Sequence, residues 1–132
     1  MKIYSGIFFD NGLHMTWDYN PGKCKLPHNI SDDVAGNVII TGGLFNHAIG
    51  YLTCERVGRS EIQRECNPTD YQPHGGIPLH ITLYTAPNIS PVQSGLMLKY
   101  MTQEQRNVLL FSKPEQYIWS GKWGYFEEEK DE

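Results

Sequence analysis

The hydrophobic and polar positions of this chain repeat one short pattern twice. Residues 13–17 read LHMTW and residues 79–83 read LHITL, so each segment alternates apolar, His, apolar, Thr, apolar. Such alternation predicts strands, because successive side chains of a strand point to opposite faces of its sheet. In both segments the His and Thr side chains should therefore share one face, and the apolar side chains should enter the core.

The same kind of pattern predicts several further strands. Residues 2–9 are rich in aromatic and β-branched side chains, and Asp10-Asn11-Gly12 follows them as a typical hairpin turn. Further strands are expected over residues 38–41, 48–56 and 96–100. Because strands are so frequent, most of the chain should form sheet.

Glycines and a capping sequence indicate where the strands end. Gly42-Gly43 indicates either a turn or a close approach of two backbones, and Ser120-Gly121 indicates the turn of a hairpin over residues 117–126. Residues 102–105 (TQEQ) have the spacing of a capping box, which predicts a short helix before Pro114. The expected fold class is therefore α+β, one mostly antiparallel sheet with few short helices.

The net charge is concentrated at the C-terminal end. In this chain of 132 residues, residues 127–132 hold five acids and one base, which accounts for the whole net charge of −4. We expect a domain over residues 1–126 and an acidic, disordered tail over residues 127–132. Because residues 1–126 are electrically balanced, stable binding to long nucleic acid is not expected. The balance is compatible with a small phosphate ligand in a local pocket.

The positions of cysteine and histidine indicate in which cellular compartment the protein is expected and whether it should bind a metal ion. The cysteines, Cys24, Cys54 and Cys66, are odd in number and widely spaced, which favours reduced thiols in a cytoplasmic protein. No tight His or Cys spacing is typical of a metal site, so we expect no metal and no cofactor. No apolar run reaches about 18 residues and no leader pattern begins the chain, so neither a membrane span nor a secretory signal is expected.

The two repeated segments carry groups suited to acid–base chemistry. Opening a cyclic phosphodiester requires a base that takes a proton from water and an acid that protonates the departing oxygen. Histidine can fill both roles near neutral pH, and neighbouring hydroxyls can donate hydrogen bonds to phosphate oxygens. The residue types of the repeat, two imidazoles and two hydroxyls, therefore fit phosphodiester hydrolysis.

The sequence resembles the 2H phosphoesterase superfamily, which is defined by two such His-x-Thr/Ser motifs. The similarity is greatest to the cyclic phosphodiesterase domains of fungal and plant-type tRNA ligases, because residues 78–85 (PLHITLYT) and 91–94 (PVQS) match their second half. The resemblance implies a two-lobed fold and metal-independent hydrolysis of 2′,3′-cyclic phosphates. Only 13 residues precede His14, so the N-terminal lobe is shorter than in many members.

The resemblance also implies roles for the motif residues. His14 would be the general acid for the leaving oxygen and His80 the general base for water. Thr16 and Thr82 would hold the phosphate. The two imidazoles can exchange roles when the reaction reverses, so the division between acid and base is the part of this assignment that the sequence does not determine.

Aromatic residues near the motifs are candidates for contact with a nucleobase, because every base can stack on an aromatic ring. The candidates are Trp17, Tyr19, Tyr71, Tyr84 and Tyr4. Tyr84 lies two positions after Thr82, so a regular strand would place it on the same face. Ser94, in the segment that resembles the family, is expected either to position backbone near the second motif or to cap a loop.

Three functions are compatible with these observations. The first is a cyclic phosphodiesterase that acts on 2′,3′-cyclic phosphates of nucleotides or RNA ends. The second keeps the chemistry but degrades cyclic oligonucleotide second messengers, as small viral members of the superfamily do against host defence. The third is a nucleotide-binding module without turnover, which the intact His and Thr of both motifs disfavour.

Overall fold

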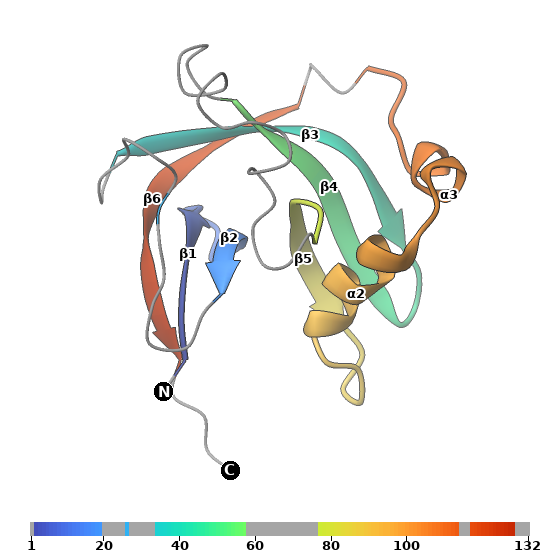
Figure 1. Cartoon of the computed structure of the whole chain (residues 1–132), viewed down its shortest axis with the longest axis horizontal. Coiled ribbons are helices and arrows are strands. Elements are labelled where there is room, and N and C mark those ends of the chain that lie inside the picture. Colours follow the sequence, from blue (N-terminus) through green and yellow to red (C-terminus); the bar gives the residue numbers. More distant parts are fainter. Residues whose placement is uncertain (1, 20–25, 27–33, 58–76, 114–116, 129–132) are drawn as a thin grey trace.

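Six antiparallel strands form a closed barrel in the spatial order β1-β2-β5-β4-β3-β6 (Figure 1). The structure is a computed structural model and describes residues 2–19, 26, 34–57, 77–113 and 117–128. The strands are β1 (Lys2–Phe8), β2 (His14–Tyr19), β3 (Ala35–Phe45), β4 (Ile49–Val57), β5 (His80–Thr85) and β6 (Ile118–Glu128). The described helices are α2 (Val92–Tyr100) and α3 (Gln103–Val108). The expected α+β class with a mostly antiparallel sheet is confirmed.

The hairpin between β1 and β2 forms where the sequence predicts it. Gly12 adopts a φ of 87°, a conformation that favours glycine, and the Leu13 amide donates to the side-chain oxygen of Asn11 at 3.0 Å. Beyond the turn, Phe8 pairs with His14. The turn chemistry therefore sets the register in which the first His-x-Thr motif enters the sheet.

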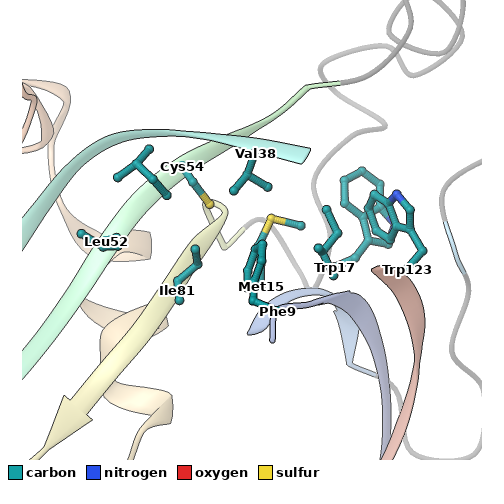
Figure 2. Close-up of a cluster of buried hydrophobic side chains, with 10 residues drawn as sticks. Phe9, Met15, Trp17, Val38, Leu52, Cys54, Ile81 and Trp123 are labelled. Atoms are coloured by element: carbon teal, nitrogen blue, oxygen red, sulfur yellow. The ribbon is translucent and has the colours of Figure 1, made fainter. Parts of the chain in front are cut away.

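The barrel interior is filled by apolar side chains from all six strands. The buried cluster consists of Ile7, Phe9, Met15, Trp17, Val38, Ile40, Leu52, Cys54, Ile81 and Trp123, most of which Figure 2 shows. Met15 and Ile81, the central apolar residues of the two motifs, are 0% exposed. The motifs thus contribute their apolar faces to the core, as their alternation predicts.

The prediction of a strand over residues 96–100 is wrong, because these residues belong to helix α2. The helix follows Pro91, and its buried residues Ser94, Gly95 and Leu98 share one helical face. Leu98 packs in a second cluster with Ile49 and Tyr51 of β4. A short apolar run fits a buried helix face as well as a strand, and packing against β4 decides in favour of the helix.

The capping box at residues 102–105 is confirmed at the start of helix α3. The amide of Gln105 donates to the Thr102 hydroxyl at 3.1 Å, and the Gln105 side-chain oxygen accepts from the Thr102 amide at 2.8 Å. These two bonds satisfy backbone donors that the first turn of a helix otherwise leaves without partners. Local sequence was sufficient to predict this helix because the cap involves only neighbouring residues.

The prediction of a hairpin over residues 117–126 is wrong, because nearly all of this segment belongs to the single long strand β6. Residues 118–122 pair with β3 and residues 122–128 pair with β1, so β6 closes the barrel. A Cβ on Gly121 would lie 2.5 Å from the Phe8 carbonyl oxygen. Gly121 therefore permits a close approach of neighbouring backbone instead of a turn.

Gly42-Gly43 also lies inside a strand, so the turn reading is wrong and the close-approach reading is right. Strand β3 continues through both glycines to Phe45, beyond the expected end at residue 41. A Cβ on Gly42 would collide with the backbone of Leu109, and Gly42 forms a bridge with Leu110. The missing side chain lets the segment after α3 approach β3 closely and hydrogen-bond to it at this point.

The acidic tail begins later than the sequence suggested. Glu127 and Glu128 belong to β6, where they pair with Ile3 and Lys2. The expectation of disorder from residue 127 is therefore wrong for these two residues, because the partner strand β1 extends as far as Lys2. Residues 129–132 lie outside the described residues.

Cys54 should be chemically inert in the folded protein. Its thiol is buried, and desolvation, with a smaller contribution from the neighbouring Glu55 carboxylate, raises its pKa far above the usual value. In a variant in which Cys24 and Cys66 are serine, we expect little reaction with a thiol reagent at pH 8 and complete reaction after unfolding. A spectrophotometric thiol titration measures both, and rapid labelling of the native variant would contradict the assignment of Cys54 to the core.

Candidate acid–base site

The two motif strands lie side by side in the barrel. Strands β2 and β5 are antiparallel neighbours, and their described register pairs Met15 with Ile81. These two residues stand at the centres of the two motifs, and their side chains are in the core. The His and Thr side chains on either side of them consequently project from the opposite face of the sheet.

This register crosses the two motifs. Continued by one residue in each direction, the Met15–Ile81 pairing sets His14 opposite Thr82 and Thr16 opposite His80. The two histidines are then diagonal neighbours on one face, a relation in which the two Cα atoms are typically roughly 7–8 Å apart. All four side chains are partly exposed. The two imidazoles and the two hydroxyls would therefore share one face of the sheet.

The backbone determines which nitrogen of His80 is protonated. The His80 Nδ1 lies 2.8 Å from the carbonyl oxygen of Pro78, which can only accept, so Nδ1 donates. In the neutral ring the lone pair is therefore on Nε2. A histidine that holds its lone pair on Nε2 in this way can take a proton from water, which supports the role of general base.

Helix α2 and strand β4 enclose the His80 ring. A Cβ on Gly95 of α2 would lie 3.2 Å from Cε1 and 3.6 Å from Nε2 of His80. Tyr51 meets the same ring edge-on, with 6.5 Å between the ring centroids. Gly95 thus allows the helix to pack closely against the imidazole, and both contacts restrict the ring's orientation.

Tyr51 is a residue of the site that sequence reasoning missed. It is 0% exposed, it pairs with Thr82, and its hydroxyl has no hydrogen-bond partner in the described part of the chain. Burial raises the pKa of this hydroxyl, which keeps it protonated at neutral pH. The alternation of residues 48–56 placed Tyr51 on a sheet face, but only the pairing of β4 with β5 brings it to the motif.

Ser94 contacts the second motif directly. The hydroxyl oxygens of Thr82 and Ser94 lie 2.6 Å apart, and the Ser94 hydroxyl donates to the carbonyl of Pro91 at 2.9 Å. A hydroxyl has one proton, so in this arrangement Thr82 donates to Ser94. For Thr82 to donate to a phosphate oxygen instead, Ser94 must release Pro91 and donate to Thr82. Ser94 therefore controls the direction in which Thr82 donates.

If the site hydrolyses the cyclic phosphate that the sequence leads us to expect, replacing Ser94 by alanine should lower kcat more than it changes KM. Without the Ser94 oxygen, the Thr82 hydroxyl loses the buried partner that orients it, and a lost hydrogen bond of this kind corresponds to about 1 kcal/mol, or about fivefold in rate. Steady-state kinetics on a 2′,3′-cyclic nucleotide measures the effect. Ser90→Ala is the matched control, because the Ser90 hydroxyl accepts a hydrogen bond from the Val92 amide at the start of the same helix and has no described contact with either motif. Equal kinetics in Ser94→Ala and wild type would show that Thr82 acts without Ser94.

Three aromatic rings stand beside the first motif. The Tyr4 ring lies 5.0 Å from that of His14, and the Phe8 ring lies 5.7 Å from it in a stacked orientation. Phe126 lies 5.0 Å from Tyr4. Tyr4 was a candidate from the sequence, whereas Phe8 and Phe126 were missed. Phe8 lies on β1, four residues after Tyr4, and Phe126 lies on β6, opposite Tyr4. That these rings come together is evident only once β1 is known to pair with β6.

The structure does not bring Trp17 to this site. Trp17 follows Thr16 on β2 and therefore points to the opposite face, where it is 8% exposed. Its indole packs edge-on against Trp123, and the Arg56 guanidinium lies 5.3 Å from its ring centre. These contacts place Trp17 in the barrel interior, where stacking on a base is not expected.

Tyr84 has a structural role that the sequence did not indicate. Its ring covers Gly50 on the adjacent strand, where a Cβ would collide with it, and its hydroxyl donates to the Asn46 carbonyl at 2.8 Å. The ring is 44% exposed, so contact with a ligand stays a prediction. Tyr19 contributes its backbone to the pairing with Tyr4. The Tyr19 side chain and Tyr71 lie outside the described residues.

Comparison with known proteins gives no further assignment. No family model matches the chain, and no curated protein and no solved structure matches it significantly. Within the described ranges, no three His, Cys, Asp or Glu side chains form a group that could hold a metal ion. In the same ranges, no helix is long and apolar enough to span a membrane.

Proposed function

We propose that this protein is a metal-independent cyclic phosphodiesterase of the 2H type. Its substrates would be 2′,3′-cyclic phosphates of nucleotides or RNA ends, and its product a phosphomonoester. The observation that carries the proposal is the Met15–Ile81 pair of β2 and β5, which joins the two motifs at their centres. Continued by one residue in each direction, this register would set each motif histidine across from the threonine of the other motif. The hydrogen bond from His80 Nδ1 to the Pro78 carbonyl also supports the proposal, because it leaves the lone pair of the neutral ring on Nε2, as a general base requires.

Each motif residue has a defined part in the proposed reaction. His80 takes a proton from water through Nε2, and the water oxygen forms a bond to phosphorus. The bond between phosphorus and one ribose oxygen breaks, and protonated His14 gives its proton to that oxygen. The ring opens with one water consumed, and His80 ends protonated while His14 ends neutral. The Thr16 and Thr82 hydroxyls donate to the phosphate oxygens as charge develops there.

The six strands close a single barrel, so the two lobes of the proposed fold correspond to two sides of this barrel. Strands β1, β2 and β6 form one side in Figure 1, and β4 and β5 with α2 form the other. The described pairing between β2 and β5 consists of Met15 and Ile81 alone, whereas on the other side of the barrel β3 pairs along both β4 and β6. We infer that the phosphate binds where the two sides meet.

A substrate panel tests the proposal. Purified protein is incubated with nucleoside 2′,3′-cyclic phosphates, RNA with a 2′,3′-cyclic phosphate end, and cyclic di- and trinucleotides, and the products are identified by chromatography and phosphorus NMR. We expect phosphomonoester from the first two substrates and undiminished rates in excess chelator. Hydrolysis restricted to the cyclic oligonucleotides would favour a role in degrading second messengers. Binding without any product would leave a nucleotide-binding module as the function.

A further inference from the structure

A strip of aromatic side chains runs along β1 and β6, beside two paired glycines. The register pairs Tyr4 with Phe126 and Gly6 with Gly124, and Phe8 follows on β1. The ring centroids of Tyr4 and Phe8 are 6.0 Å apart, and those of Phe8 and Phe126 are also 6.0 Å apart. All three rings therefore lie on one face of the sheet. We call these five residues the aromatic strip.

The strip is continuous with His14. Two of its rings, Tyr4 and Phe8, contact the His14 imidazole at 5.0 and 5.7 Å. The third ring, Phe126, is 45% exposed although its two aromatic neighbours are more buried. A Cβ on Gly124 would be in ordinary van der Waals contact with the Phe8 ring, at 3.9 Å, so the Phe8 ring lies beside this glycine. A flat group can thus lie on the strip while its substituent reaches His14.

We propose that the aromatic strip binds the base of the nucleotide whose cyclic phosphate is opened at His14 and His80. This inference rests on the proposed function. Aromatic side chains bind nucleobases by stacking with little dependence on base identity, and purines offer the larger ring system. Since His14 protonates the leaving ribose oxygen, the ribose and its base belong on the His14 side, which is where the strip lies. The substrate is therefore a nucleoside cyclic phosphate, with purines preferred, rather than a cyclic phosphate of a bare sugar.

Replacing Phe126 by alanine tests the inference. The measured quantity is the ratio of kcat/KM for adenosine 2′,3′-cyclic phosphate to kcat/KM for ribose 2′,3′-cyclic phosphate, which lacks the base. We expect this ratio to fall about tenfold, as loss of one stacking ring predicts. Tyr125→Ala is the matched control: Tyr125 is 46% exposed and precedes Phe126, but it points to the opposite face of β6. Its ratio should equal that of wild type.

A second variant tests the strip without removing a ring. Gly124→Leu places a bulky side chain against the Phe8 ring, and it should raise KM for the nucleotide more than it raises KM for the base-free substrate. Circular dichroism and the melting temperature establish that each variant is folded. An unchanged ratio in both folded variants, or an equal loss on both substrates, would overturn the inference.

The inference and the proposed function can fail separately. If wild-type protein hydrolyses neither substrate, the proposed function fails, and calorimetric titration with adenosine 2′-monophosphate then measures the strip directly. Binding by wild type that is weakened in Phe126→Ala and unchanged in Tyr125→Ala would support the strip as a base site. Equal binding by all three proteins, or no binding, would overturn it.

Discussion

Replacing His80 by alanine is expected to lower kcat for 2′,3′-cyclic phosphate hydrolysis by about a thousandfold, within the range that general acid–base catalysis contributes. The variant lacks the Nε2 lone pair that the hydrogen bond from Nδ1 to the Pro78 carbonyl keeps available to accept a proton. His14→Ala should cause a loss of similar size, because the leaving oxygen then departs without a proton. Steady-state rates, followed by chromatography of the phosphomonoester, measure both losses.

The control for these variants is His47→Ala. His47 is an exposed residue between β3 and β4, outside both motifs, and its replacement should leave kcat within about twofold of wild type. The double variant His14→Ala/His80→Ala should be little slower than either single variant, because the two imidazoles act in one step and their effects are not additive. If both single variants retained full turnover while remaining folded, two-histidine catalysis would be excluded.

Replacing Gly6 by alanine is expected to lower the free energy of unfolding by about 3 kcal/mol, the upper end of the usual cost of overpacking. A Cβ at this position would collide with the carbonyl oxygen of Met15 on the neighbouring strand. The collision is with backbone, so no side chain can move aside to relieve it. Strands β1 and β2 must separate locally, which would also displace the first motif.

Gly124→Ala provides a matched control for this substitution. Gly124 is the direct partner of Gly6 in the β1–β6 ladder, but a Cβ there would meet only the Phe8 ring, at 3.9 Å. Its replacement should change stability by less than about 0.5 kcal/mol. Urea denaturation followed by tryptophan fluorescence measures both variants. Equal stability of the two would mean that β1 and β2 do not approach as closely at Gly6 as the structure shows.

The elements that could be predicted are those with local causes. The β1–β2 hairpin depends on Asn11 and Gly12, and the start of helix α3 depends on the bonds between Thr102 and Gln105. The faces of the two motif strands followed from alternation alone. In each case the interactions that form the element are made by residues close together in the chain.

The elements that were predicted wrongly depend on distant partners. Residues 117–126 read as a hairpin because Ser120-Gly121 is a typical turn, but pairing with β1 and β3 on both sides keeps β6 extended. Residues 96–100 read as a strand until Leu98 is seen to pack against β4 as part of α2. A glycine that favours a turn in isolation serves equally well where two backbones must pass closely.

The same distinction between local and distant causes applies to the residues of the candidate site. The paired Leu-His-x-Thr segments were visible in the sequence, and so was the fact that each His and its Thr share a face. Whether the two segments would be neighbours, and in which register, was decided only by the tertiary structure, because the Met15–Ile81 pair joins residues far apart in the chain. The tertiary structure likewise selected Tyr4 and Phe8 as the rings beside His14, packed Phe126 against both, and placed Trp17 in the core. Alternation within one strand assigns a side chain to a face, but which residues meet across that face depends on the strands that pair with it.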